Sequence, residues 1–410
     1  MFIHFKFPSP APWQACRAAL LVFLSAAAHA QVAQTPTLAA ALDAAWSLSP
    51  NARAFVNRQA ELGARQRATE ALLSSPPNLT LAHRNDRLAS NLGLREYEAE
   101  LGLPLWHPGV RGATAAQVVA ERTAFESQQR TARLAVAAQV RELAANAALA
   151  RLECALALRK QTEAQALAQD VQRRVTAGDA ARIDALLAEA AARQAAALLA
   201  QSEAALAQLQ GQWHLLTGLA QFAPPEEAVQ PPATGSHPLA HAAETKVHAA
   251  SARLALTEAD SRDPLELGVG LARERSVAGE GAQTAVRLSV RIPFGGDQRN
   301  APRLAAARAE LDTAWAESDA TSRQVQAEVA GAHQGLQAAQ RAFTLAAERQ
   351  ALNAEVLALI ATSYRLGESD LPTRLRAENE RFEAELALAR ARTELHRATA
   401  RLNQAQGLLP

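Results

Sequence analysis

Residues 364–385, YRLGESDLPTRLRAENERFEAE, place a glycine and a proline inside a long run of helix-favouring sequence. Gly367 is followed five residues later by Pro372, and an earlier stretch, RVTAGDAARIDALLAEAAAR, has the same layout around Gly178. Glycine readily adopts the left-handed conformation that ends a helix, and proline fits the first turn of the next helix. Each stretch therefore predicts a tight turn that joins the two helices of a hairpin.

These two turns belong to a sequence that is duplicated at an offset of 189 residues. The offset relates Pro104 to Pro293, Gly178 to Gly367, and Gly218 to Gly407. Glycine and proline are uncommon in this alanine-rich chain, so their coincidence indicates a genuine internal repeat. We predict repeat 1 over residues 31–220, a proline-rich connector over 221–236 and repeat 2 over 237–410.

The first thirty residues have the three parts of a secretory signal peptide. Lys6 and Arg17 precede the apolar run Ala18–Ala28, and an Ala-His-Ala cleavage motif ends at Ala30. The apolar run is too short to span a bilayer. We therefore predict a signal peptide over residues 1–30 and a mature protein outside the cytoplasm. Removal of the signal peptide, which contains Cys16, leaves Cys154 as the single cysteine and so excludes a disulfide within the mature chain.

Each repeat is predicted to open with a helical segment, Leu38–Leu73 or Leu239–Asp260, and to continue with two strands. In repeat 2 the strands are Pro264–Ala272 and Thr284–Ile292, where apolar residues alternate with polar or small ones. Such alternation is typical of strands that have one apolar face. The residues expected to face lipid are Leu265, Leu267, Val269, Leu271, Val286, Leu288, Val290 and Ile292. Repeat 1 shows a weaker version around Leu79 and Leu81 and over Tyr97–Leu103.

A very long helical pattern follows the strands in each repeat, over Gly112–Val175 and Pro302–Tyr364. Sixty-odd helical residues make a rod of roughly 90–100 Å. The predicted fold class is therefore mainly α with a small β part, built from duplicated long helical hairpins. Four strands cannot close a barrel, and a bilayer tolerates no open sheet edge. Several protomers are therefore expected to share one transmembrane β-barrel, with their hairpins forming an α-barrel.

Composition and motifs favour neither nucleic-acid binding nor catalysis. The 42 basic and 41 acidic residues nearly cancel, and no block of basic residues stands out. No nucleophile-elbow, phosphate-loop or zinc-protease pattern is present, so we predict that the chain is not an enzyme and uses no cofactor. His241, Glu244 and His248 share a helix face beyond His237, but no further ligands stand out nearby. Solvated residues at a helix start are therefore expected rather than a metal site.

The ordered set of motifs resembles the TolC family of bacterial outer-membrane efflux proteins. It consists of GLPLWHPGVRGA, SVRIPFGGDQRNAPRLAAARAEL and the stretch that begins YRLGESDLPTRLRAENERF. The resemblance implies a homotrimer in the outer membrane, with a twelve-strand barrel continued by a helical tunnel into the periplasm. It also implies a passive exit duct for solutes, such as metal cations or drugs, that an inner-membrane pump delivers through a periplasmic adaptor. The SVRIPF junction is most similar to members that serve heavy-metal pumps.

The same resemblance places the periplasmic tip, with its gate and docking surface, near the glycine turns. The residues expected there are Gly178, Asp179, Ile183, Asp184, Gly367, Glu368, Asp370, Leu371, Thr373 and Arg376. The two positions that carry acids in some family members, six and nine residues after the glycine, fall here on Thr373 and Arg376. This departure argues against a cation-binding acidic ring, although Asp184 lies six residues after Gly178 in the first repeat. The acids at the turns either contribute to the gate or only cap helix starts.

Two other functions fit the same elements. A secreted periplasmic coiled-coil scaffold or adaptor would fold its strands into a small compact domain, whereas a tunnel needs an apolar outer band. A tunnel could instead serve protein secretion. The aromatic girdle of an outer-membrane barrel is thin, with Tyr97, Trp106 and Phe294 as its candidates.

Overall fold

The computed structural model describes residues 35–232 and 235–410, so the predicted signal peptide lies outside the described residues. In the first repeat the elements are α1 (Leu38–Leu48), α2 (Pro50–Thr69), β1 (Asn78–Asn85), β2 (Arg95–Leu105), α3 (Val110–Ala177) and α4 (Arg182–Thr217). In the second they are α5 (Pro238–Ala259), β3 (Leu265–Arg275), β4 (Gln283–Arg291), α6 (Asp297–Arg365) and α7 (Leu371–Ala405). The order of helix, two strands and long hairpin therefore occurs twice.

Several element boundaries differ from the prediction; strand β3, for example, continues to Arg275, three residues beyond the expected Ala272. The single helical segment Leu38–Leu73 is wrong, because Ser49 ends α1 and its hydroxyl accepts a hydrogen bond from the backbone N–H of Asn51 in α2. Pro50 then occupies the first turn of α2, where its missing N–H costs nothing. Helix α6 begins before the expected Pro302, which lies inside it. So close to the helix start, a proline removes only one intrahelical hydrogen bond.

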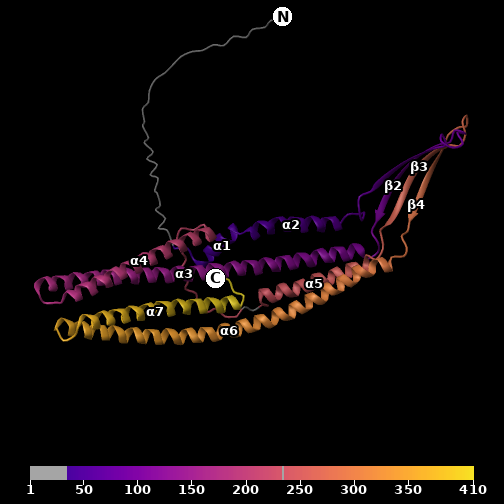
Figure 1. Cartoon of the computed structure of the whole chain (residues 1–410). Helices are drawn as coiled ribbons and strands as arrows, with labels where there is room; N and C mark the ends of the chain where they lie inside the picture. The colour runs from indigo at the N-terminus through magenta and orange to yellow at the C-terminus, as the bar shows by residue number, and fades with distance from the viewer. Residues whose placement is uncertain (1–34, 233–234) are drawn as a thin grey trace, which may run out of the picture. The chain divides into compact units, whose positions relative to one another are not determined.

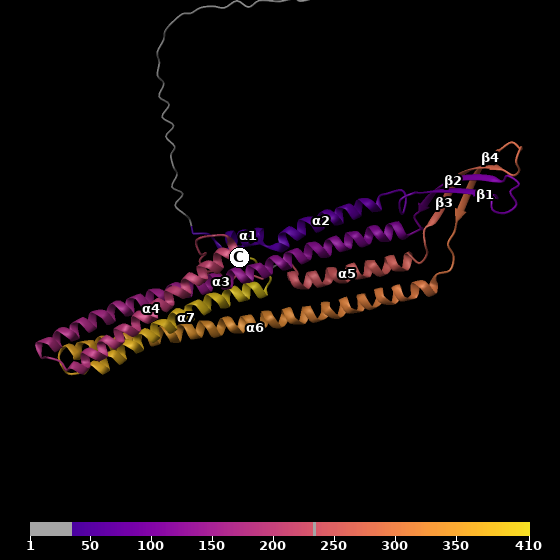
Figure 2. The same ribbon diagram turned by 45° about the horizontal axis from the view of Figure 1, so that its top comes forward.

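The two long hairpins, α3 with α4 and α6 with α7, lie side by side in the half of the molecule that contains their turns, where α3 contacts α7 (Figures 1 and 2). In the other half α5 contacts both α3 and α6 and lies between them. Helix α3 has 68 residues and α6 has 69, so each is roughly 100 Å long. Alanine dominates their buried contacts, with Ala137, Ala144, Ala147 and Ala195 fully buried. Because alanine has a single methyl group, the helices approach closely, which explains how a chain with few bulky residues packs.

The middle of the unit Pro36–Pro410 contains its largest buried side chains. Trp213 of α4 packs against Phe222 of the connector with ring centroids 5.6 Å apart, and Leu42 of α1 joins the same cluster. The Trp213 indole N–H donates to the Gln221 backbone oxygen at 2.9 Å. The proline-rich connector is thus anchored onto the first repeat.

A buried polar network fastens the connector to both repeats. Arg141 of α3 donates two hydrogen bonds to the carboxylate of Glu227, at 2.7 and 2.8 Å. It also donates to the Gln404 side chain at 2.6 Å and to the Leu408 backbone oxygen at 3.0 Å. Asn403 of α7 donates at 2.9 Å to Glu227 Oε2, the oxygen that also accepts a hydrogen bond from Arg141 Nη2. One ion pair therefore joins α3, the connector and the C-terminal segment.

The four strands form one antiparallel sheet in the order β1-β2-β3-β4. They extend from the ends of the helices that lie opposite the hairpin turns (Figure 1). Within the described residues no helix packs on either face of the sheet, and β1 and β4 are left as free edges. No helix in the described part of the chain is long and apolar enough to cross a membrane.

Candidate functional site

The two hairpin ends are built in the same way. Gly178 and Gly367 have φ angles of 86° and 80°, in the left-handed region that glycine adopts without strain. After Gly178, the N–H of Asp179 donates to the Arg174 oxygen at 2.8 Å, and after Gly367 the N–H of Glu368 donates to the Ser363 oxygen at 2.9 Å. These bonds satisfy carbonyls that a helix end leaves open.

The returning helices begin differently in the two repeats. Asp370 precedes α7 and its carboxylate accepts a hydrogen bond from the backbone N–H of Thr373 at 3.0 Å, while Pro372 lies in the first turn. Hydrogen bonds from the Thr373 side chain and backbone lower the pKa of Asp370 below its ordinary value. Helix α4 starts after Ala181 with no side-chain cap, although Asp184 lies in its first turn. The second hairpin end is therefore the better capped.

The predicted tip residues lie at these two hairpin ends, and most of their side chains are exposed. Ile183 is 65% exposed and Leu186 is 62% exposed, so two large apolar side chains face solvent near the start of α4. Leu371 is the exception, since it is only 3% exposed and packs with Tyr364 against the first hairpin. Its side chain therefore contributes to packing and offers no surface to a partner.

Tyr364 is a tip residue that our sequence reasoning did not single out. It is buried, and the guanidinium groups of Arg174 and Arg374 both contact its ring, with central carbons 5.2 and 5.0 Å from the ring centroid. Arg174 belongs to α3 and Arg374 to α7, so these two contacts connect the hairpins. A cation–π contact of this kind contributes about 0.5–2 kcal/mol, depending on its desolvation. With only two tyrosines in the chain, its place beside the glycine turn was the available signal.

Ion pairs run along the contact between α3 and α7, away from the tip. They join Glu163 to Arg381, Arg159 to Glu385, Glu153 to Arg390 and Glu142 to Arg397. Residue numbers rise on one helix as they fall on the other, as antiparallel helices in a fixed register require. Several of the side chains are substantially exposed, so each pair contributes little stability by itself. Together they specify the register of one repeat against the other.

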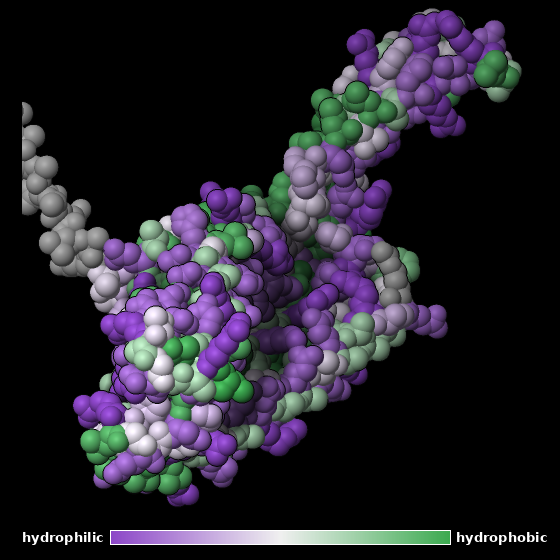
Figure 3. Space-filling model, turned by 60° about the vertical axis from the view of Figure 1, so that its left-hand side comes forward, coloured by the Kyte–Doolittle hydropathy of each residue, from purple (hydrophilic) through white to green (hydrophobic). Residues whose placement is uncertain are grey.

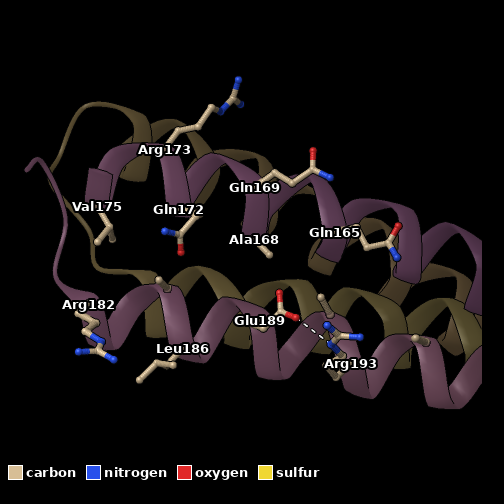
Figure 4. A pocket seen from close by; sticks show the side chains of 13 residues that line it. Gln165, Ala168, Gln169, Gln172, Arg173, Val175, Arg182, Leu186, Glu189 and Arg193 are labelled. Atoms are coloured by element: carbon tan, nitrogen blue, oxygen red, sulfur yellow. Dashed lines mark hydrogen bonds and ion pairs between the residues drawn. The ribbon is translucent and has the colours of Figure 1, made fainter. Parts of the chain in front are cut away.

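An open groove of about 1050 Å³ lies between α3 and α4 close to the first turn. The residues that line it include Gln165, Gln169 and Gln172 of α3 and Leu186 and Glu189 of α4. Figure 4 shows Gln172 extending toward α4, whereas Gln169 extends away from it. Glu189 is paired with Arg193 at 2.8 Å. The groove therefore combines amide groups, which donate and accept hydrogen bonds, with an exposed leucine, a composition suited to another helix rather than to a small ligand.

The sheet has one apolar and one polar face. Register pairs Leu101 with Val269 and Val269 with Leu288, and pairs Ala99 with Leu271 and Leu271 with Val286. The other predicted lipid-facing residues, Leu265, Leu267 and Val290, follow on the same side, while Ile292 lies one residue beyond β4. In Figure 3 hydrophobic residues gather on the part of the strand region nearest the helices, and hydrophilic ones predominate toward its far end.

The polar face is crossed by side chains that lie flat over small residues of the strand between them. Glu266 of β3 accepts a hydrogen bond from Asn78 of β1 at 2.7 Å, above Gly102 of β2. Glu100 of β2 accepts a hydrogen bond from Ser289 of β4 above Gly268. A Cβ atom on either glycine would overlap these side chains. The absence of side chains at these glycines therefore lets the two carboxylates lie against the backbone of the sheet.

No group of three histidine, cysteine, aspartate or glutamate side chains suited to a metal ion occurs in the described parts of the chain. In the histidine cluster of α5, His241 and Glu244 form one contact at 3.8 Å. His237 instead caps the start of α5, where its Nδ1 accepts a hydrogen bond from the Leu239 N–H at 3.2 Å. Burial lowers the pKa of His237.

The sequence model of the outer membrane efflux protein family matches residues 233–408, which span the second repeat. Residues 233–408 are an outer membrane efflux protein domain. This match confirms the predicted resemblance to the TolC family, the outer-membrane location and the prediction that the chain is not an enzyme. The match over residues 233–408 implies a role in outer-membrane efflux. No curated protein matches the sequence.

Solved structures share the fold of this chain over nearly their whole length. A membrane protein from Pseudomonas aeruginosa is 21% identical, with a TM-score of 0.73 over 90% of this chain and 93% of that one. CusC is 18% identical, with a TM-score of 0.75 over 91% and 92%. The outer membrane protein VceC from Vibrio cholerae is 16% identical, with a TM-score of 0.70 over 90% and 96%. The predicted fold class is thus confirmed.

Proposed function

We propose that three copies of this efflux protein close one barrel and form a passive exit duct across the outer membrane. The observation that carries the proposal is the sheet itself, which has an apolar face, a polar face and two free edges. An apolar face this exposed needs lipid or a partner, and free edges are not tolerated in a bilayer. Pairing β4 of one protomer with β1 of the next removes every edge.

The polar face supports passage of hydrophilic solutes, with a preference for cations. Its strands carry five acidic and three basic residues: Glu96, Glu98, Glu100, Glu266 and Glu274, and Arg84, Arg287 and Arg291. Two negative charges per protomer remain in excess. Like charges in a narrow lumen repel anions and concentrate cations. Metal cations or cationic drugs are therefore the solutes that this wall favours.

The hairpin ends supply the docking surface in this proposal. A periplasmic adaptor that carries its own helical hairpin would insert into the groove between α3 and α4, where Leu186 and the glutamines provide contacts. The exposed Ile183 extends this surface to the turn. An inner-membrane pump then delivers solute through the adaptor. Helix-in-groove binding of this kind uses apolar anchors at helical spacing with a polar surround.

The strand face can be tested by matched arginine substitutions. Val286→Arg directs a charge to lipid, at a cost of about 2–4 kcal/mol near the bilayer centre, and should prevent recovery of trimers from outer-membrane fractions. Ala285→Arg, one residue earlier, directs the same charge to the lumen and should leave trimer yields unchanged. Equal trimer yields from the two variants would refute the face assignment. Recovery of the wild-type mature protein as a water-soluble monomer would refute the proposed function as a whole.

Docking is tested separately by inserting residues after Gly178. The insertion lies at the end of a hairpin, so it should leave trimer assembly intact while abolishing export of a cationic substrate from cells. A matched insertion in the loop between β1 and β2, at the opposite end of the molecule, should preserve export. Unimpaired export after the Gly178 insertion would remove the docking assignment without affecting the channel. Of the alternative functions, a compact scaffold domain is disfavoured because no described helix covers the sheet.

A further inference from the structure

Three arginines cluster on the apolar side of the sheet, close to the loops that join the strands. Arg95 of β2 and Arg275 of β3 are direct register partners. Arg273 precedes Arg275 by two residues on β3 and is the register partner of Tyr97. Because side chains alternate between faces along a strand, all three share the face of Leu271 and Val269.

None of these three guanidinium groups has a hydrogen-bond or ion-pair partner among the described residues, and the Nε of Arg275 is buried without one. The arginines of the opposite face behave differently, since Arg287 pairs with Glu98 and Arg291 with Glu266 at 3.1 Å. The carboxylates nearest in sequence, Glu96 and Glu274, belong to that opposite face.

Asp86, in the loop between β1 and β2, forms hydrogen bonds within its own loop and none with these arginines. Asp86 accepts hydrogen bonds from the Ser90 hydroxyl at 2.9 Å and from the backbone N–H groups of Leu92 and Gly93 at 2.6 and 3.1 Å. Its carboxylate organises its own loop. The positive charge of the cluster is therefore not neutralised by the chain's own carboxylates within the described residues.

Like charges directly opposite each other on a sheet are destabilising. The fold retains Arg95 opposite Arg275, so an external anion that neutralises the pair would stabilise it. A guanidinium group has a planar fork of donors that matches phosphate oxygens in two-point contacts. Three such groups on adjacent positions form a surface that fits phosphate better than a carboxylate or a halide.

The cluster lies where the apolar band ends. The row of Ala99, Leu271 and Val286 is apolar, and the next row toward the loops contains His83, Tyr97 and Arg273. The rings of His83 and Tyr97 stack with centroids 4.4 Å apart. Aromatic residues with a polar atom gather at the level of lipid headgroups. The arginines therefore stand at headgroup depth, on the side away from the helices.

We propose that Arg95, Arg273 and Arg275 bind the phosphate groups of lipid A in the outer leaflet of the outer membrane. The proposal rests on the proposed function, because the helices must lie in the periplasm for this end of the strands to reach the outer leaflet. Phosphorylated glycolipid is the anionic lipid of that leaflet, and its phosphates stand directly above the acyl chains that the apolar band contacts.

The test measures lipid A retained by the detergent-extracted full-length trimer, quantified by mass spectrometry, and binding of added lipid A to the trimer in nanodiscs. The triple variant R95Q/R273Q/R275Q should bind lipid A about a hundredfold more weakly, from the usual contribution of each arginine at an anionic membrane surface. The control R323Q/R341Q/R349Q removes the same charge from exposed positions of α6, where no ion pair among the described residues is lost, and should bind as the wild type does.

Wild-type affinity in the R95Q/R273Q/R275Q trimer would overturn the proposal. If that variant does not assemble, wild-type trimer is tested with lipid A from which both phosphates have been removed, and undiminished binding would overturn it equally. So would equally tight binding of phosphatidylglycerol, which points to a general anionic lipid. Failure of the wild-type chain to form a membrane-inserted trimer is observed before any lipid is added, and counts against the proposed function instead.

Discussion

Removing Arg141 should destabilise the junction of the two repeats more than any exposed ion pair in the molecule. The side chains of Arg141 and Glu227 are only 4% and 7% exposed. Arg141→Met keeps most of the side-chain volume but leaves Glu227 buried with Asn403 as its remaining side-chain partner. Leaving one member of a buried pair uncompensated costs about 3–5 kcal/mol. The Gln404 side chain also loses a donor at 2.6 Å.

The assay is denaturant-induced unfolding of the detergent-solubilised protein, followed by helical circular dichroism. Arg141→Met and Glu227→Leu should each lower the free energy of unfolding by about 3–5 kcal/mol. The double variant should lose less than the sum, because neither charge is then left buried alone. The exposed pair Glu189–Arg193 provides the control, where Arg193→Met should cost no more than about 1 kcal/mol. Equal losses from Arg141→Met and Arg193→Met would refute the reasoning.

Three further predictions concern the lumen and the tip. Gly268→Ala should displace the Glu100 carboxylate from the sheet and lower single-channel conductance without changing trimer yield. Gly281→Ala, in the loop between β3 and β4, should leave conductance unchanged, because a Cβ there meets nothing. Tyr364→Ala should speed amide exchange at both hairpin ends, and Tyr364→Phe should not, because packing and cation–π contacts survive. Asp370→Ala should speed exchange of the Thr373 amide near neutral pH. Since hydrogen bonds lower the pKa of Asp370, the capping contribution is present above its unfolded-state pKa and is lost as pH falls through the lower folded-state value, where wild type and variant should converge.

The long hairpins and strands could be predicted because their signals are local and occur twice. Gly178 and Gly367 mark the turns through a conformation that few other residues adopt, and strand alternation depends only on neighbouring residues. The break at Ser49 was missed because serine and proline also occur inside loops, and only the cap geometry shows that two helices meet there. Periodicity also gave no information on Glu227, whose partners lie 86 and 176 residues away.

The duplication explains the cross-links of the polar face more directly than local sequence does. Glu98 and Arg287 are separated by 189 residues, as are Glu100 and Ser289, while Asn78 and Glu266 are separated by 188. The first two bridges therefore join equivalent positions of the two repeats, and the third is one residue out of phase. In register, however, the partner of Asn78 two strands away is Gly268, so equivalent positions are staggered by two residues.

A stagger of this kind is what closing a sheet into a barrel requires, because closure tilts the strands against the barrel axis. If β1 of the next protomer pairs with β4, that strand lies between β4 and its own β2, just as β3 lies between β2 and β4 within one chain. Arg287 would then have a glutamate two strands away on either side, Glu98 of its own chain and Glu98 of the next. Replacing Glu98 with Gln should therefore weaken trimers in detergent more than replacing Glu274, which has no ion-pair partner in the described residues; equal trimer stability would contradict the continuity of this wall across protomers.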